Sequence, residues 1–263
     1  MEESSRQSYL QAMGIQTYSL RKSIKTSMED PIESGSIGSS IESFDSVSDA
    51  TISDGSIKEP KIDRPIESTP VGSVDISSLS WNELQNQVVN CKACNLCNTR
   101  TNTVFGSGNP NADVMVIGDA PGSAEDEQGI PFLGAGGNLL DAMLQSIDLN
   151  RSKVFITNNL KCHPTDGHGS LDNEVAACEA YLIRQIELIK PKIILSLGGL
   201  SAKNLLKSNE KVGMLRQQKQ ETVKQKVPVQ VSYHPGYLLR KPSEKAKVWE
   251  DLKKLKKTMQ NLI

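Results

Sequence analysis

The stretch Val114–Gly137, VMVIGDAPGSAEDEQGIPFLGAGG, is the part of the sequence that decides the fold. It opens with a short apolar run rich in β-branched residues, which is typical of a buried parallel strand, and the run ends at Gly118. The loop that follows holds Asp119, Glu125 and Asp126 among glycine and proline. Because open α/β sheets bind ligands at the carboxyl ends of their strands, we expect chemistry in this loop.

A second glycine-rich turn, Gly129 to Gly137, places Phe132 between glycines, where an aromatic ring is available for stacking. A helix is predicted from about Asn138, because apolar residues recur there on one helical face. These residues are Leu139, Leu140, Met143, Leu144 and Ile147. The turn lacks the lysine of a P-loop and the G-x-G-x-x-G fingerprint, which argues against a nucleotide cofactor.

Three later apolar runs are predicted to be strands, and each is followed by a helix or a polar loop. The strands are Lys153–Asn158, Lys192–Gly198 and Val227–Tyr233. One helix is predicted to start at Ser80. Further helices are predicted over Asp172–Lys190, Ser201–Lys207 and about Ser243–Leu262, and a mobile basic segment is predicted at 208–226. This alternation predicts an α/β fold of three layers, α/β/α, with a four-stranded parallel sheet covered by helices on both faces.

Composition divides the chain near residue 80. Residues 1–80 hold 7 Lys and Arg against 13 Asp and Glu, a net charge of -6, so the rest carries +5 of the overall -1. The part from Glu29 to about Ser78 has too few apolar residues to offset its ordering entropy. We expect residues 1–79 to be a largely disordered N-terminal extension, with docking to a repair or replication protein as its alternative role, and residues 80–263 to form the catalytic domain.

No apolar run reaches membrane-spanning length, and the first residues lack the pattern of a signal peptide. We therefore expect a cytoplasmic, monomeric protein with no membrane partner. The modest positive charge of the part after residue 80 suits a polyanion such as DNA.

Five cysteines form a spaced set that suggests a metal centre. Cys91-x2-Cys94-x2-Cys97 precedes the first strand, Cys162 follows the second, and Cys178 lies in the next predicted helix. Cys91 and Cys94 with Cys162 and Cys178 would supply four soft ligands to an iron–sulfur cluster or a structural zinc, and spacing does not choose between these. Unrelated buried thiols are the plainer alternative, and Cys97 is left over.

Polar side chains stand at three predicted strand ends: Asp119 with the nearby Glu125, then Asn158, then His234. Each alone is more often a turn former or a cap. Because the carboxyl ends of parallel strands meet at one edge of a sheet, their repetition predicts a shared crevice.

Together these motifs resemble the family 4 uracil-DNA glycosylases, the iron–sulfur members of the uracil-DNA glycosylase superfamily. The resemblance runs from about Trp81 to the C-terminus. It rests on C-x2-C, GDAPGSAED, GIPFLGAGGNLLDAML, VFITNNLKCHP, Cys178, IILSLGGLSA and SYHPGYLLRKP, in the order of the family. It implies an enzyme that hydrolyses the N-glycosidic bond of uracil in DNA, leaves an abasic site and so initiates base excision repair.

The resemblance also implies roles for individual residues. Cys91, Cys94, Cys162 and Cys178 would hold a structural [4Fe–4S] cluster. Phe132 would stack on the extruded uracil, Asn158 would bind its amide edge, and His234 would donate a hydrogen bond toward a uracil carbonyl. The backbone of Gly118 and Ala120 would shape the pocket, and Asp119 or Glu125 would supply a carboxylate near the sugar. Leu238 would fill the gap left in the duplex, with Tyr237 beside it, and Arg240 would meet phosphates.

The sequence departs from the family at Asp119, where Glu is usual, at Gly236, where Ala or Ser is usual, and at His163, where Arg is common. The shorter Asp119 places the carboxylate differently. Two alternatives follow: a non-catalytic iron–sulfur DNA-binding module associated with replication, and a zinc-stabilised hydrolase of small nucleotides.

Overall fold

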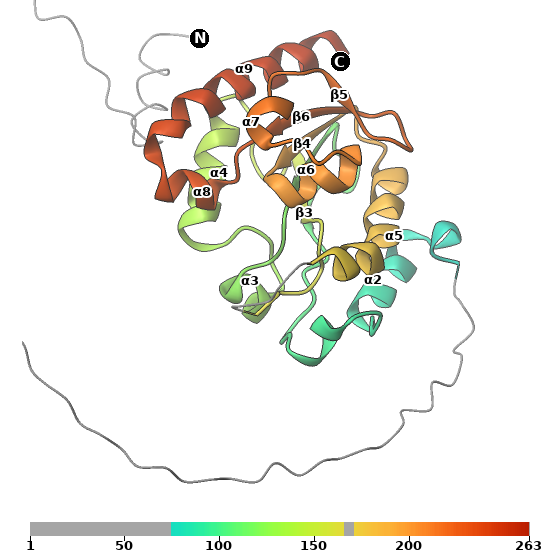
Figure 1. The fold of residues 1–263 in the computed structure, drawn as a ribbon. Helices are drawn as coiled ribbons and strands as arrows, with labels where there is room; N and C mark the ends of the chain where they lie inside the picture. The colour runs from blue at the N-terminus through green and yellow to red at the C-terminus, as the bar shows by residue number, and fades with distance from the viewer. Residues whose placement is uncertain (1–74, 166–170, 263) are drawn as a thin grey trace, which may run out of the picture. The chain divides into compact units, whose positions relative to one another are not determined.

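The computed structural model describes residues 75–165 and 171–262 (Figure 1). Its centre is a six-stranded sheet with the order β1-β3-β2-β4-β6-β5. The strands are β1 Ser107–Gly108, β2 Val114–Gly118, β3 Val154–Asn158, β4 Ile193–Leu197, β5 Gln220–Glu221 and β6 Pro228–Ser232. The four predicted strands form the parallel core β3-β2-β4-β6, as expected. The two-residue strands β1 and β5, which were not predicted, pair antiparallel at its two edges.

Helices surround this sheet and connect its strands. The α-helices are α2 Trp81–Val89, α3 Ser123–Gln128, α4 Gly134–Gln145, α5 Asp172–Ile189, α6 Gly199–Leu206, α7 Val212–Leu215, α8 Pro235–Arg240 and α9 Lys245–Leu262. Short 3-10 helices are η1 Ile76–Ser78, η2 Asn95–Asn98 and η3 Pro242–Glu244. The prediction of a mobile segment at 208–226 is corrected here, because α7 and β5 lie in it and Leu215 is buried.

Side-chain alternation along the strands produces two apolar layers, one on each face of the sheet. One face presents residues such as Val116, Ile156 and Leu195 to α4, α8 and α9. The other presents residues such as Ile117 and Ile194 to α2, α5, α6 and α7. Figure 1 shows α4, α8 and α9 grouped on one side of the sheet and α2 with α5 on the other. The three-layer α/β/α prediction is therefore confirmed.

Residues 75–79 belong to the ordered structure, although they were predicted to be part of the extension. Ile76–Ser78 forms η1, and Asp75 Oδ1 accepts the Ser77 N–H at 3.0 Å. Arg184 on α5 donates from Nε to the Leu79 carbonyl at 2.8 Å. The rest of the predicted extension, up to residue 74, lies outside the described residues.

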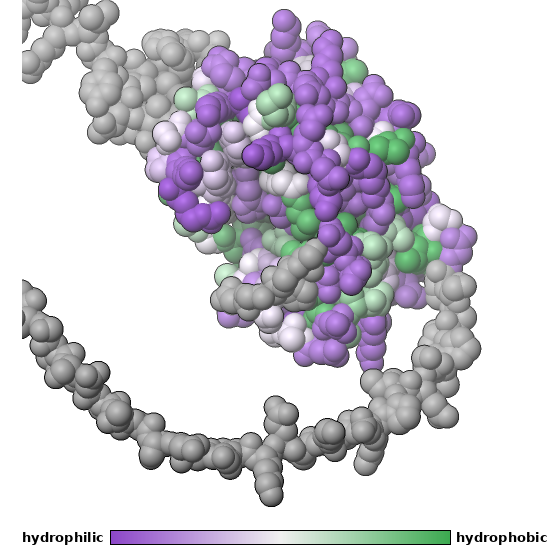
Figure 2. Space-filling view, viewed as in Figure 1, coloured by the Kyte–Doolittle hydropathy of each residue, from purple (hydrophilic) through white to green (hydrophobic). Residues whose placement is uncertain are grey.

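The helix α2 starts after Ser80, as predicted, and it has a capping box. The Glu83 carboxylate accepts hydrogen bonds from the Ser80 backbone N–H at 2.8 Å and from its hydroxyl at 2.6 Å. The described surface in Figure 2 is mainly hydrophilic, with smaller apolar areas between polar side chains. Within residues 75–165 and 171–262, no helix combines the length and apolar character that crossing a membrane needs.

Candidate active site

The ends of β2 and β3 bring three of the predicted pocket residues into contact. Gly118 and Asn158 are register partners at the last position of the β2–β3 pairing. A Cβ added at Gly118 would overlap both Asn158 Oδ1 and the ring of Phe132. Glycine is therefore required at this strand end, because the amide and the aromatic ring both lie against its backbone.

Asn158 is a buried amide without a protein partner. The residue is 1% exposed, and neither its Oδ1 nor its Nδ2 atom makes a hydrogen bond. Buried polar groups in native proteins are nearly always satisfied, and leaving one unpaired costs about 1–3 kcal/mol. An unpaired donor and acceptor side by side therefore indicate a ligand that supplies both partners.

The loop that carries Phe132 is held in an unusual backbone conformation. Phe132 has φ 55°, in the left-handed region that non-glycine residues seldom adopt. Arg151 fixes the loop by donating from Nη2 to the Phe132 carbonyl at 2.6 Å and from Nη1 to the Pro131 carbonyl at 3.1 Å. Gly137 allows the approach, since a Cβ there would overlap the Phe132 carbonyl. The sequence analysis missed Arg151, whose role depends on contacts 20 residues away.

His234 stands at the start of α8 and faces Phe132. The two rings stack with centroids 5.4 Å apart and an angle of 29°. Nδ1 of His234 accepts the Gly236 N–H at 3.1 Å, so the neutral imidazole carries its proton on Nε2. Burial, and then the charge of Arg240, lower the pKa of His234 to about 4. The ring is a neutral N–H donor at physiological pH.

The Asp119 carboxylate lies at the start of α6. Its Oδ1 accepts the Ser201 N–H at 2.8 Å, and a Cβ at Gly198 would overlap it. Burial raises the pKa of Asp119 to about 6, although the N–H groups of Ser201, Leu200 and Gly199 oppose the rise. The carboxylate therefore titrates close to physiological pH.

Glu125 was predicted to share the carboxylate role, but its oxygens bind the backbone. Oε2 accepts the Gly122 N–H at 2.5 Å and Oε1 accepts the Leu133 N–H at 3.1 Å. These bonds tie the beginnings of α3 and α4 together. Ala120 packs beside the cysteine-containing apolar cluster, and its neighbour Asp119 accepts the Leu160 N–H through its carbonyl at 3.1 Å.

Asp119 and His234 line one cavity of about 520 Å³ at the carboxyl edge of the sheet. Its other lining residues are Gly198, Gly199, Lys211, Val212, Gly213, Tyr233, Tyr237 and Arg240. Lys211 was not predicted, because α7 reaches this edge only through the tertiary fold. The cavity adds two cations, Lys211 and Arg240, to the polar groups of the strand ends.

The two consecutive leucines of α8 differ in exposure, which corrects one prediction. Leu238 is 1% exposed and packs in the core with α4 and α9. Leu239 is 44% exposed. A side chain buried among core residues does not reach a DNA duplex, so Leu239, and not Leu238, is the leucine available to fill a gap between bases.

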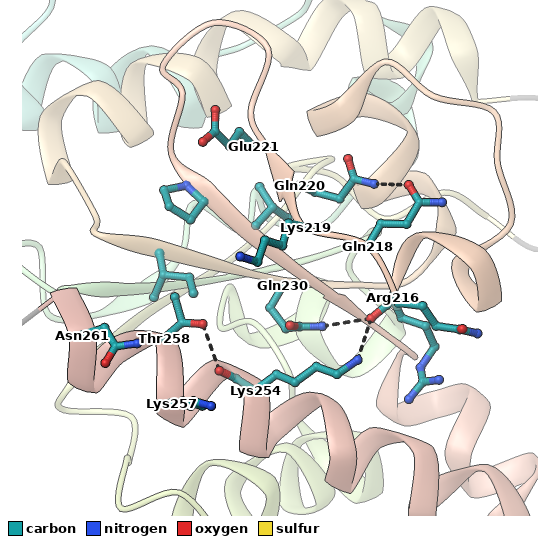
Figure 3. Close-up of a pocket in the computed structure, with 14 residues that line it drawn as sticks. Arg216, Gln218, Lys219, Gln220, Glu221, Gln230, Lys254, Lys257, Thr258 and Asn261 are labelled. Atoms are coloured by element: carbon teal, nitrogen blue, oxygen red, sulfur yellow. Dashed lines mark hydrogen bonds between the residues drawn. The ribbon is translucent and has the colours of Figure 1, made fainter.

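A larger cavity lies away from these residues. It is a groove of about 850 Å³ along the β5–β6 edge and α9, and its lining includes Ile193 and Pro228 at the amino ends of β4 and β6. Figure 3 shows Lys219, Lys254 and Lys257 around it, with Lys254 donating to the Arg216 carbonyl at 3.4 Å. Because Asn158 and His234 follow the opposite ends of their strands, this groove is separate from the candidate active site.

The predicted ligand cysteines converge at a second site beside the pocket. Cys162 and Cys178 are buried in one cluster, and Cys94 packs against it. Burial raises the pKa of Cys162 most, and the charges of Cys94 and Cys91 raise it further, so these thiols are close in space. Arg100 donates from Nη1 to Cys162 Sγ at 3.0 Å and from Nη2 to the Cys91 carbonyl at 2.7 Å. All five cysteines are free thiols.

Burial dominates the chemistry of these thiols. It raises the pKa of Cys178 to about 11 and also raises those of Cys94 and Cys162. Such thiols stay protonated until a metal displaces the protons. Within the part of the chain that the structure describes, no group of three or more His, Cys, Asp or Glu side chains has the arrangement that holds a single metal ion.

Comparison with known proteins agrees with this architecture. The model of the Uracil DNA glycosylase superfamily matches residues 105–253. The chain therefore belongs to the uracil DNA glycosylase superfamily, within which it is similar to the type-4 enzymes. The Type-4 uracil-DNA glycosylase of Sulfurisphaera tokodaii is 38% identical over 184 residues, covering 67% of this chain and 84% of the relative. That of Archaeoglobus fulgidus is 36% identical over 182 residues, covering 67% and 92%.

Proposed function

We propose that this protein is a uracil-DNA glycosylase, which hydrolyses the bond between uracil and deoxyribose in DNA and leaves an abasic site. The observation that carries the proposal is the buried Asn158 amide, whose donor and acceptor both lack a partner. Membership of the superfamily supports the same activity. An enzyme that cuts a base from its sugar must take that base out of the stack and read its Watson–Crick edge.

Uracil fits the amide of Asn158 because it places a carbonyl beside an imide N–H. The Asn158 Nδ2 group donates to the carbonyl and Oδ1 accepts from the N–H. Cytosine presents an acceptor and an amino donor in the reverse arrangement, so it leaves both groups of the buried amide mismatched. Phe132, which lies against Gly118 beside the amide, supplies an apolar ring for the face of the base.

Breaking the glycosidic bond leaves negative charge on uracil and positive charge on the sugar. The neutral His234 donates from Nε2 to a uracil carbonyl, and this bond strengthens as the anion forms. The ionised Asp119, in the same cavity as His234, stabilises the positive sugar or orients the attacking water. Because Glu125 is not among the lining residues of this cavity and its oxygens bind backbone N–H groups, we assign Glu125 to holding the loop.

Phosphates of DNA meet Lys211 and Arg240 at the mouth of this cavity, and Tyr237 lies beside them. Leu239 fills the gap that the extruded base leaves in a duplex. Asn158 and Phe132 are not among the lining residues of this cavity, and Phe132 connects the amide to it by stacking on His234.

The chemistry of the cysteines suits a [4Fe–4S] cluster held by Cys91, Cys94, Cys162 and Cys178. Cys94, Cys162 and Cys178 belong to one cluster, and the charge of Cys91 acts on Cys162, which supports a set of four soft ligands. Arg100, which donates to Cys162 Sγ, would offset their negative charge, and the Ala93 N–H donates to Cys91 Sγ at 3.5 Å. A bound cluster would join α5, the β3 loop and the segment before β1 as a structural cross-link. Free thiols and such a cluster suit the reducing cytoplasm.

The test is incubation with a single-stranded oligonucleotide that holds one uracil, followed by alkali. Strand breaks at the uracil support the glycosylase, and the same oligonucleotide with thymine or cytosine is the control. An intact uracil strand that the iron-loaded protein still binds would contradict the proposal and favour a non-catalytic DNA-binding module.

A further inference from the structure

Lys161 is a buried lysine between the cysteines and the pocket. Its residue is 2% exposed, and it is among the largest fully buried side chains of the described residues. Lysine is almost never fully buried unless its ammonium group is paired. The groups near Lys161 lie on two sides, one toward the pocket and one toward the cysteines.

On the pocket side, the Lys161 ammonium binds the end of β3. Nζ donates to the Asn158 carbonyl at 2.7 Å and to Thr157 Oγ1 at 2.6 Å. Thr157 in turn donates to the Phe105 carbonyl at 2.8 Å. The last carbonyl of the strand and the hydroxyl before it are therefore both held by one side-chain nitrogen.

On the other side, the same residue contacts the cysteines. The backbone N–H and the side chain of Lys161 lie near the Cys178 thiol, and the side chain also lies near Cys162. Cys162 is also the next residue in the chain.

Asn158 depends on this fixation because its side chain has no hydrogen bond of its own. Only its backbone and the packing against Gly118 and Phe132 hold the amide. A shift of the Asn158 peptide therefore moves the amide directly, and misplacing a recognition group by about 1 Å costs on the order of 100-fold in rate.

We infer that Lys161 is a positioning residue that holds the Asn158 amide in its uracil-reading orientation, anchored from the cysteine side. The inference rests on the proposed function. Lys161 touches neither base nor sugar in this scheme, and it acts through the carbonyl of Asn158. The segment between β3 and Cys162 thereby joins the metal centre to base recognition.

The experiment replaces the ammonium group and keeps the chain length, as Lys161→Met. The matched control is Lys153→Met, the same change at an exposed lysine just before the same strand. Each protein is purified with its iron and measured for iron per chain, for binding of free uracil, and for single-turnover excision from a single strand. Lys161→Gln, a shorter neutral donor, is the second variant if Lys161→Met does not fold.

We expect Lys161→Met to keep its iron and its KM for DNA. Excision and free-uracil binding should each fall by about 10- to 100-fold, the usual loss for a supporting residue. The control should match the parent. In an Asn158→Ala background the Lys161→Met change should have no further effect, because the group that it positions is gone.

Unchanged excision and uracil binding in Lys161→Met would overturn the inference. So would an equal loss in the parent and Asn158→Ala backgrounds, or loss of iron from both Lys161 variants, which would assign the residue to the cluster alone. Failure of the parent protein to release uracil tests the proposed function instead, and free-uracil binding still reports on Lys161 in that case.

Discussion

Asn158 and Asn159 are adjacent buried amides that differ in their hydrogen bonds. Asn159 Oδ1 accepts a hydrogen bond from Asn204 at 2.7 Å and only its Nδ2 lacks a partner, whereas both polar atoms of Asn158 lack partners. A residue kept in an unsatisfied state contributes nothing to folding through its polar atoms. We take this contrast as the residue-scale sign that Asn158 serves a ligand.

Replacing Asn158 with Ala should therefore separate activity from stability. Excision should fall by about 100-fold or more, the usual loss on removing one transition-state donor, while the free energy of unfolding stays equal or rises. Asn159→Ala is the matched control and should lose about 1 kcal/mol of stability, because it removes a satisfied bond. Urea unfolding and single-turnover excision check both. Parental excision by Asn158→Ala would remove Asn158 from the pocket.

The pH dependence of excision should follow Asp119. Its pKa is raised to about 6, and the ionised form is the one that stabilises a positive sugar, so the rate should rise through about pH 6 and then level. His234, whose pKa is lowered to about 4, remains neutral across this range. Asp119→Asn should lower the rate and abolish the step near pH 6. A pH profile of single-turnover excision measures this, and a step that persists in Asp119→Asn would assign it elsewhere.

The free energy of unfolding should depend on the protonation of His234 as the pH falls from about 6.5 to about 4. The unfolded chain binds a proton to this histidine from about pH 6.5 downward, whereas the folded state binds it only near 4. The unfolded state therefore holds more protons between these values, and this contribution to stability is lost as pH falls from about 6.5 to about 4. Thermal unfolding of the parent and of His234→Gln checks it: the parent should lose more stability over this interval, and equal losses would contradict the assignment.

At the scale of elements, α8 presents one leucine to the core and the next to solvent. Leu238→Ala should cost about 2–5 kcal/mol in the free energy of unfolding, because it leaves a cavity among α4, α8 and α9. Leu239→Ala should change stability by less than about 0.5 kcal/mol, and should reduce excision from duplex DNA more than from single strands. Urea unfolding and the duplex-to-single-strand ratio of kcat/KM distinguish them. Equal losses on both substrates would reject Leu239 as the wedge.

The helix α9 is fastened to α7 by a buried ion pair that also reaches the sheet. Arg216 Nη2 lies 2.8 Å from Asp251 Oδ1, and Ser232 donates to Asp251 Oδ2 at 2.7 Å. Asp251→Ala should destabilise the protein by about 3–5 kcal/mol, because an unpaired guanidinium remains buried. The exposed pair of Lys253 and Glu250 is the control, and Glu250→Ala should cost less than about 1 kcal/mol in the same denaturation experiment.

At the scale of the whole molecule, the cysteines connect segments that are distant in the chain. Cys162→Ser should lose iron, the visible absorption of the cluster and stability together, because it removes one of four ligands. Cys97→Ser should keep its iron, its visible absorption and its stability, since Cys97 is not one of the four proposed ligands. Iron analysis and absorption spectra of the two purified variants check the assignment. Loss of iron from Cys97→Ser with retention in Cys162→Ser would reverse it.

Local sequence patterns were sufficient for the four parallel strands and the longer helices, and less so for the short elements and for side-chain roles. The apolar runs at β2, β3, β4 and β6 are short and bounded by polar residues, so their strand assignment followed directly. Consecutive residues on a helix point about 100° apart, and the sequence HPGYLLR does not state which leucine faces the core. Packing against α4 and α9 makes that choice.

Glu125 and Arg151 show the same limit at the pocket. A carboxylate in the β2 loop was predicted to serve chemistry, yet both oxygens of Glu125 accept backbone N–H groups from two helix starts. Arg151, distant in sequence, binds the carbonyl of Phe132. Contacts between separate segments leave no periodic signal, so the sequence alone did not reveal them.

The sequence by itself determined the order of strands and helices, the position of polar residues at strand ends and the spacing of the cysteines. Each of these follows from local periodicity or from short spacings along the chain. Only the tertiary structure decided that Asn158 lacks partners, that Leu239 is exposed in place of Leu238, and that Lys161 is buried with its Nζ on the Asn158 carbonyl. These properties depend on which surfaces pack together, and packing joins residues that the sequence keeps far apart.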